Sequence, residues 1–135
     1  MYIFTLYLIT FMNVLTERLR KTEIIEKVEN RFKKSDLPVL DVGDSIKIKT
    51  IIQEGNKERI QVVDGVIISK NNSNLNTTIT IRKVLQNVGV ERVYLIHSPR
   101  IVEISVVKKA KVRRAKLYYL RYRSGKATRL KQKFT

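Results

Sequence analysis

The charge of the last 28 residues limits what this chain can fold into more than any other feature. Residues 108–135 hold twelve Lys or Arg side chains and no Asp or Glu, whereas residues 1–107 hold 16 basic and 12 acidic side chains. Such a segment repels itself and buries little apolar surface, so we expect it to be poorly ordered without a polyanion. The core must therefore come from the preceding residues, and the C-terminal segment is expected to bind a partner.

Apolar and aromatic side chains lie among the cations of this segment, namely Leu117, Tyr118, Tyr119, Leu120 and Tyr122. Nucleic acid offers phosphates for the cations and base faces or grooves for the rings. The pattern therefore favours nucleic acid as the partner. We expect a helix over residues 112–123, stopped by Ser124 and Gly125, in which Leu117 and Leu120 dock on the folded domain or on a partner. The three tyrosines are expected either to pack or to stack on nucleotides.

Enzyme chemistry has little support in this sequence. The chain has no Cys, which excludes disulfides and thiolate metal sites, and its single imidazole is His97. The acidic residues are scattered without metal-ligand spacing, and the five glycines are too far apart to form a phosphate loop. We therefore expect no catalytic residue, metal, cofactor or small-molecule substrate.

The first fifteen residues are largely apolar and carry no charged side chain. This run is shorter than the roughly 20 residues of a transmembrane helix, and it lacks the basic start of a secretory signal. We expect an apolar extension, with Met12 as an alternative first residue, and a membrane partner is disfavoured. The opposing hypothesis inserts residues 1–15 into a membrane and places the basic segment on anionic lipid.

The hydrophobic period changes from helical to extended at Pro38. Apolar side chains recur every three or four residues over residues 16–34, which predicts a helix that the Leu37–Pro38 pair ends. Alternating patterns then predict five short antiparallel strands, with a bulge or bend at Gly65 and an exposed Asn-rich loop at 71–76. The predicted strands cover residues 44–53, 59–70, 77–84, 90–96 and 101–107.

The predicted fold is mainly β, a small SH3-like barrel of about five strands with an N-terminal helix and a basic, partly helical C-terminal extension. Closure into a barrel is favoured because it leaves no bare strand edge. The corresponding segments are residues 1–15 for the extension, 16–36 for the helix, 37–107 for the barrel and 108–135 for the basic RNA-binding extension.

Candidate RNA contacts fall in two groups. Those near strand ends of the barrel are Arg82, Lys83, Arg92, His97 and Arg100. Those in the C-terminal segment are Lys108, Lys109, Lys111, Arg113, Arg114, Lys116, Tyr118, Tyr119, Arg121, Arg123, Lys126, Arg129 and Lys131. The second group carries the stronger prediction, because no folding requirement explains so many cations without one counter-charge.

Short stretches spread over residues 37–130 resemble, in order, large-subunit ribosomal protein nineteen of the bacterial type. They are Asp41-Val42-Gly43-Asp44, Arg59-Ile60-Gln61-Val62, Gly65-Val66-Ile67-Ile68, Thr80-Ile81-Arg82-Lys83, Gly89-Val90-Glu91-Arg92-Val93, His97-Ser98-Pro99, Ile104-Ser105-Val106, Val112-Arg113-Arg114-Ala115-Lys116-Leu117-Tyr118-Tyr119-Leu120-Arg121 and Ser124-Gly125-Lys126-Ala127. The Asn-rich loop lacks the Gly and basic residues common there in that family, and the apolar start has no family counterpart.

This resemblance implies an SH3-like barrel and a structural role in the large ribosomal subunit, at the face that meets the small subunit. The implied partners are large-subunit rRNA, small-subunit rRNA at the interface and neighbouring ribosomal proteins, with a contribution to inter-subunit bridges. The abundance of residues with A/T-rich codons favours a plastid stroma over a bacterial cytoplasm. The alternative function is a free-standing RNA- or DNA-binding regulator that uses the same barrel.

Overall fold

The computed structural model describes residues 21–133, which fall in two units divided at Lys33 and Lys34. In the first unit, residues 21–32 form a helix. Its apolar side chains are exposed, among them Ile24, Val28 and Phe32. The predicted start of this helix and the apolar residues 1–15 lie outside the described residues.

The helix ends at Phe32, two residues before the end of the predicted helical pattern at Lys34. The reason lies in the second unit, where the chain from Lys34 onward is bonded to the β-sheet domain. The Lys34 backbone N–H donates to His97 Nδ1 at 3.2 Å, and its ammonium group donates to the carbonyls of Ser98 and Ile101. The Lys34 backbone N–H is therefore bonded to His97 and not to a carbonyl of the preceding helical turn.

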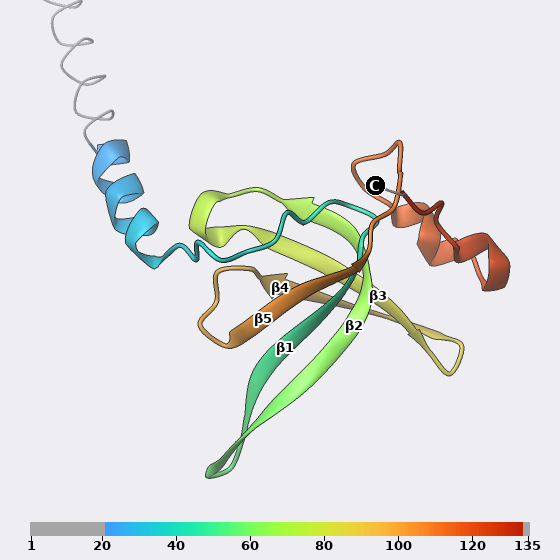
Figure 1. Cartoon of the computed structure of the whole chain (residues 1–135), viewed down its shortest axis with the longest axis horizontal. Coiled ribbons are helices and arrows are strands. Elements are labelled where there is room, and N and C mark those ends of the chain that lie inside the picture. Colours follow the sequence, from blue (N-terminus) through green and yellow to red (C-terminus); the bar gives the residue numbers. More distant parts are fainter. Residues whose placement is uncertain (1–20, 134–135) are drawn as a thin grey trace, which may run out of the picture. The chain divides into compact units, whose positions relative to one another are not determined.

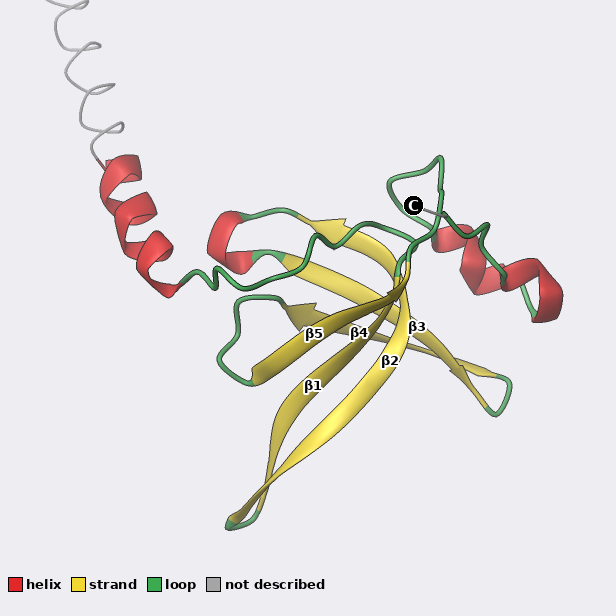
Figure 2. Cartoon of the chain, in the orientation of Figure 1, coloured by secondary structure: helices red, strands yellow, loops and turns green. Residues whose placement is uncertain are grey.

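The second unit is built on one antiparallel sheet of five strands, shown in Figures 1 and 2. This confirms the predicted strand number, and every observed strand end lies within two residues of the expected one. The strands are β1 (Ser45–Glu54), β2 (Lys57–Asn71), β3 (Thr78–Leu85), β4 (Val88–Leu95) and β5 (Ile101–Lys108). A short 3-10 helix, η1 (Asn74–Asn76), lies in the Asn-rich loop.

The strand order β4-β3-β2-β1-β5 leaves β4 and β5 as edges, so closure into a barrel is not confirmed. Within the described residues no ladder joins these two strands. Both edges nevertheless reach the same core, because Tyr94 of β4 and Ile104 of β5 pack in one cluster. The sheet therefore curls around its core without closing.

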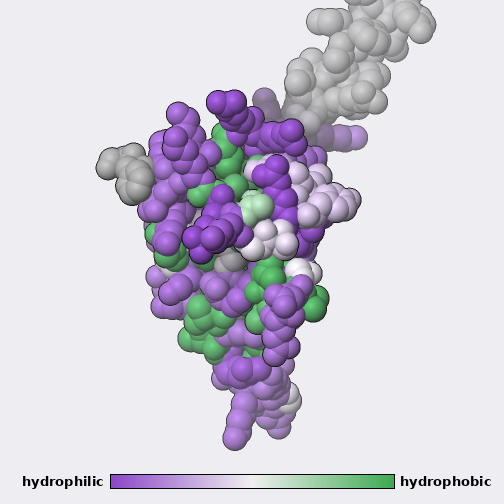
Figure 3. Space-filling model, turned by 90° about the vertical axis from the view of Figure 1, so that its right-hand side faces the viewer, coloured by the Kyte–Doolittle hydropathy of each residue, from purple (hydrophilic) through white to green (hydrophobic). Residues whose placement is uncertain are grey.

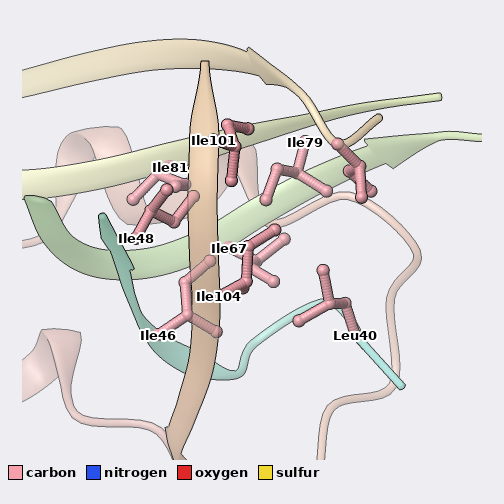
Figure 4. Close-up of a cluster of buried hydrophobic side chains, with 9 residues drawn as sticks. Leu40, Ile46, Ile48, Ile67, Ile79, Ile81, Ile101 and Ile104 are labelled. Carbon is pink, nitrogen blue, oxygen red and sulfur yellow. The ribbon is translucent and has the colours of Figure 1, made fainter. Parts of the chain in front are cut away.

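The core is made almost entirely of isoleucine, a β-branched residue suited to pleated strands. Alternate positions on β1 and β3 supply two isoleucines each, β2 and β5 supply three more, and Leu40 joins them from the segment before β1 (Figure 4). The buried members are Leu40, Ile46, Ile48, Ile67, Ile79, Ile81, Ile96, Ile101 and Ile104.

The predicted irregularity in the second strand occurs at Ile68 and not at Gly65. In the β2–β3 ladder Ile67 pairs with Ile81 and Ser69 pairs with Thr80, so Ile68 is the extra residue of a bulge. Gly65 has a different role, because a Cβ there would lie 2.5 Å from the Ile81 side chain and 2.9 Å from the Arg82 carbonyl oxygen. Glycine at this position lets β2 and β3 approach closely.

Candidate nucleic-acid interface

The bulge at Ile68 is where the basic C-terminal segment meets the sheet. Ile67 and Ile68 are both buried, but Ile67 belongs to the main core while Ile68 packs with Leu117 and Leu120 in a second cluster. The Leu117 backbone N–H donates to the Ile68 carbonyl at 2.8 Å. Of the two alternatives for Leu117 and Leu120, docking on the folded domain or on a partner, the structure shows the first.

A buried carboxylate makes a second attachment. Asp44 is 1% exposed, and its side chain accepts the backbone N–H groups of Asp41 and Ala110, each at 3.2 Å. Because Asp41 precedes the sheet and Ala110 follows it, one side chain joins the two ends of the domain. Both side-chain oxygens of Asp44 have hydrogen-bond partners, as buried polar atoms require.

The C-terminal segment is also bonded to itself. Backbone hydrogen bonds run from Lys111 N–H to the Lys131 carbonyl and from Lys133 N–H to the Lys109 carbonyl, both at 2.9 Å. An antiparallel bridge pairs Ala110 with Gln132 between them. The two ends of the segment therefore lie side by side.

These contacts correct the expectation of a helix over residues 112–123. The predicted continuous helix is absent; the structure has two 3-10 helices, η2 (Tyr118–Tyr122) and η3 (Gly125–Thr128). Leu117 and Leu120 are three residues apart, so the three-residue turn of a 3-10 helix places both on the face toward Ile68. The expectation of poor order for the isolated segment stays a prediction; in the folded chain, the sheet supplies an apolar anchor that the segment lacks alone.

A carboxylate on β4 holds η2 against the sheet. Arg121 donates to both oxygens of Glu91, from Nε at 2.9 Å and from Nη2 at 2.7 Å. Arg82, which faces Glu91 across the β3–β4 ladder, donates to the same carboxylate at 3.0 Å. These hydrogen bonds, above all those from Arg121, hold the pKa of Glu91 below its usual value, against the opposing effect of burial.

Two tyrosines of η2 lie against guanidinium groups. The Tyr119 ring has the guanidinium carbons of Arg114 and Arg123 at 5.5 and 4.8 Å from its centroid. The Tyr118 ring has Arg121 at 4.5 Å and the Lys116 ammonium at 6.0 Å. All four separations suit cation–π attraction. The third ring, that of Tyr122, is 92% exposed.

The predicted cations of the C-terminal segment gather around shallow hollows in its surface. One hollow of about 600 Å³ is lined by three stretches of the segment, and none of its lining residues is acidic. We call it the basic hollow. Its charged and aromatic lining consists of Lys111, Arg113, Arg114, Tyr119, Arg123, Arg129 and Lys131. Lys108, Lys109 and Arg129 line a neighbouring hollow of about 550 Å³, and Lys126 is exposed on η3.

Figure 3 views the molecule from the side on which η2 and η3 lie in Figure 1. The surface there is mostly hydrophilic, with smaller hydrophobic patches between the polar groups. A polar surface with many cations suits binding to nucleic acid, since protein–nucleic acid interfaces are more polar and more positive than protein–protein interfaces.

Of the candidates on the sheet, Arg82 is brought beside one of the C-terminal segment, because it shares Glu91 with Arg121, and none of the five lines the basic hollow. Arg82 and Lys83 each bind a carboxylate of the sheet, Glu91 and Asp64 respectively, and the Lys83 ammonium lowers the pKa of Asp64. His97 accepts the Lys34 backbone N–H. Two further candidates, Arg92 and Arg100, are exposed on β4 and in the turn before β5.

Sequence reasoning missed the two acidic residues that position the basic segment. Asp44 and Glu91 both lie within stretches that had been singled out for their resemblance, but scattered carboxylates gave no sign of partners 66 and 30 residues away. The available signal was that a chain with a long cationic segment also holds single carboxylates, which can bind that segment. Lys133 and Tyr122 also lie on this surface without having been chosen as contacts.

Between residues 21 and 133, no cluster of three or more His, Asp or Glu side chains is placed to bind a metal ion. No helix in that range is long and apolar enough to span a bilayer.

Comparison with known proteins gives the family directly. Residues 23–133 match the family described as Ribosomal protein L19, which extends the resemblance to include the helix at residues 21–32. The large ribosomal subunit protein bL19c of Gracilaria tenuistipitata var. liui is 67% identical over 114 residues, covering 84% of this chain and 93% of the relative.

Two further relatives agree. The large ribosomal subunit protein bL19 of a Cyanothece strain is 59% identical over 112 residues, covering 83% of this chain and 93% of its own. The bL19c protein of Mesostigma viride is 56% identical over 117 residues, covering 87% and 98%. A β-sheet domain with an anchored cationic extension and these matches lead to one conclusion: the chain belongs to the ribosomal protein L19 family.

Proposed function

We propose that this chain binds large-subunit rRNA through the exposed cations of residues 108–133. Family membership makes it a structural protein of the large ribosomal subunit and not an enzyme, as the sequence predicted. One observation carries the proposal of rRNA binding: a segment with twelve cations and no acidic residue is fastened to a folded domain by buried apolar contacts. The domain is the support, and the segment is the binding surface.

The proposed binding is largely electrostatic. Each phosphate that a Lys or Arg neutralises releases condensed counterions, which adds about 0.9 to the slope of log affinity against log salt for a duplex and about 0.7 for a single strand. Not all twelve cations are free to do this, because Arg121 already binds Glu91. Anchoring the others on a folded domain lowers the entropy that is lost when they are ordered on RNA.

We also propose that the protein lies at the face of the large subunit that meets the small subunit. There it would contact small-subunit rRNA and neighbouring ribosomal proteins. The support is the resemblance along residues 37–130. Cross-linking in intact ribosomes tests it: cross-links from exposed lysines of residues 108–133 to small-subunit rRNA are expected, and their complete absence would reject this location.

Plastid-type relatives, bL19c, together with cyanobacterial ones support a plastid ribosome.

Substitution tests rRNA binding better than truncation. Removing residues 112–135 should abolish association with large subunits, but it would also uncover Ile68 and so perturb the sheet. The sharper experiment compares Arg113→Gln/Arg129→Gln with Lys47→Gln/Lys57→Gln, a control that removes the same charge from exposed positions of β1 and β2.

Both variants are mixed with large subunits lacking this protein and sedimented over a range of salt concentrations. The first pair should bind more weakly and reduce the salt slope by about 1.4 to 1.8, whereas the control should bind as the wild type does. Equal behaviour of the two pairs would refute the proposal. A wild-type protein that sediments mostly outside ribosomes in cell extracts would favour the free-standing regulator.

A further inference from the structure

The basic hollow places six cations around a volume of about 600 Å³ with no carboxylate in its lining. The ion pairs found among residues 21–133 involve none of these six. Like charges held this close repel one another, so the arrangement favours an anion between them. The question is which part of an RNA the hollow accepts.

Backbone contacts place the cations that line the hollow. The hydrogen bond from Lys111 N–H to the Lys131 carbonyl joins the first and third stretches of the lining. Val112 and Leu130, which lie beside cationic residues of those stretches, pack against the buried cluster around Leu117. These contacts therefore fix the backbone around the hollow without a ligand.

Tyr119 supplies the middle of the hollow. It is half-buried and packs against the same cluster, so its ring has a fixed place. Its π-system attracts the guanidinium groups of Arg114 and Arg123, which come from the chain on either side of η2. A ring that already carries two guanidiniums and packs on a core offers little free face for a base.

Arginine pairs suit phosphate. A guanidinium presents a planar fork of donors that binds phosphate oxygens bidentately, and consecutive phosphates of one strand present several anionic oxygens close together. A base carries no charge and would leave six cations without a counter-charge. One inorganic phosphate would neutralise only part of the set.

We propose that the basic hollow binds consecutive phosphates of an RNA backbone, and that Tyr119 is a positioning residue that holds Arg114 and Arg123 for this contact. The ring does not stack on a base. This inference rests on the proposed function and names the part of the RNA that the site receives.

Four full-length variants test it: Tyr119→Phe, Tyr119→Leu, Arg114→Gln/Arg123→Gln, and the combination of Tyr119→Leu with the arginine pair. The probe is the large-subunit particle lacking this protein, and affinity is measured at several salt concentrations. Phe keeps the ring and should bind as the wild type. The arginine pair should reduce the salt slope by about 1.4 to 1.8, and Leu should reduce it in part.

Positioning and stacking give different results. If Tyr119 acts through the two arginines, adding Tyr119→Leu to the arginine pair causes no further loss. If the ring stacks on a base, Tyr119→Leu weakens binding by about 5- to 150-fold without changing the salt slope, and that loss persists in the combined variant. The second pattern would overturn the proposal.

Two further measurements complete the test. Tyr119→Leu could loosen the segment, which faster exchange of the Leu117 amide would reveal. In that case the result for Arg114→Gln/Arg123→Gln tests the proposal, and an unchanged salt slope for that variant would overturn it. Inorganic phosphate at about 10 mM, added at matched ionic strength, should leave RNA binding unchanged. Loss of RNA binding in its presence would indicate that the hollow is a site for small anions. If the wild type itself fails to bind, the proposed function fails first, which is a distinguishable outcome.

Discussion

Replacing Leu117 with Ala tests whether the basic segment is held to the sheet by its small apolar cluster. Leu117 is 1% exposed and packs with Ile68 and Leu120, while its backbone N–H bonds to the Ile68 carbonyl. Leu→Ala substitutions in cores cost about 2 to 5 kcal/mol. The lower end applies here, because a cluster with three fully buried members can relax around the cavity.

A loss of about 2 kcal/mol raises the equilibrium constant for local opening roughly 30-fold. The amide of Leu117 should then exchange with solvent roughly 30 times faster, whereas the amide of Ile48 in β1 should change much less. Trypsin should cut the segment sooner, because detachment exposes its Lys and Arg residues. Hydrogen exchange followed by NMR measures both amides in one experiment.

The control is Val107→Ala, which removes a side chain that is 51% exposed on β5 and should change exchange at Leu117 by little. The reasoning is refuted if Leu117→Ala accelerates the amides of Leu117 and Ile48 equally, because the segment would then not open separately from the sheet. It is also refuted if exchange at Leu117 does not change, since the cluster would then not be the anchor.

Three other changes test the remaining attachments. Because hydrogen bonds from Arg121 lower the pKa of Glu91, its ionised form stabilises the attachment at pH values above its ordinary pKa, about 4.3, and this stabilisation is lost as pH falls through the lower folded value. Cleavage of the detached segment by an acid-active protease should rise in that range, and Glu91→Gln should remove the pH dependence. Asp44→Asn leaves an amide donor facing a backbone N–H and should cost about 1 to 3 kcal/mol in urea unfolding; an unchanged midpoint would contradict this. Gly43→Ala should lower the thermal midpoint, because φ is +98° and a Cβ would lie 2.7 Å from the Val112 side chain; equal midpoints would argue against that strain.

Much of the sheet was predictable because strands with one buried face have alternating apolar and polar residues in the sequence. Ile46 and Ile48 alternate with Lys47 and Lys49, and each pair of neighbours faces opposite sides of β1. Closure was not predictable in this way. Whether β4 and β5 pair depends on how far the sheet curls, and no local pattern encodes that.

The basic segment was understood only in part. Its cations and the docking of Leu117 and Leu120 were predicted from composition and spacing. The helix was predicted wrongly, because the pattern at 112–123 fits a helix when contacts with Ile68 and Glu91 are ignored. Those contacts join residues that lie far apart in the sequence, so the outcome depended on the fold of the sheet.

By itself, the sequence determined the five strands and a strongly cationic extension, since periodicity and charge are local properties of the chain. Tertiary structure decided how that extension is held. The bulge at Ile68 frees a carbonyl for Leu117, and Glu91 is brought against Arg121 only when β4 and η2 lie together. Contacts between distant residues arise from the folded backbone, which is why they could not be read from the sequence.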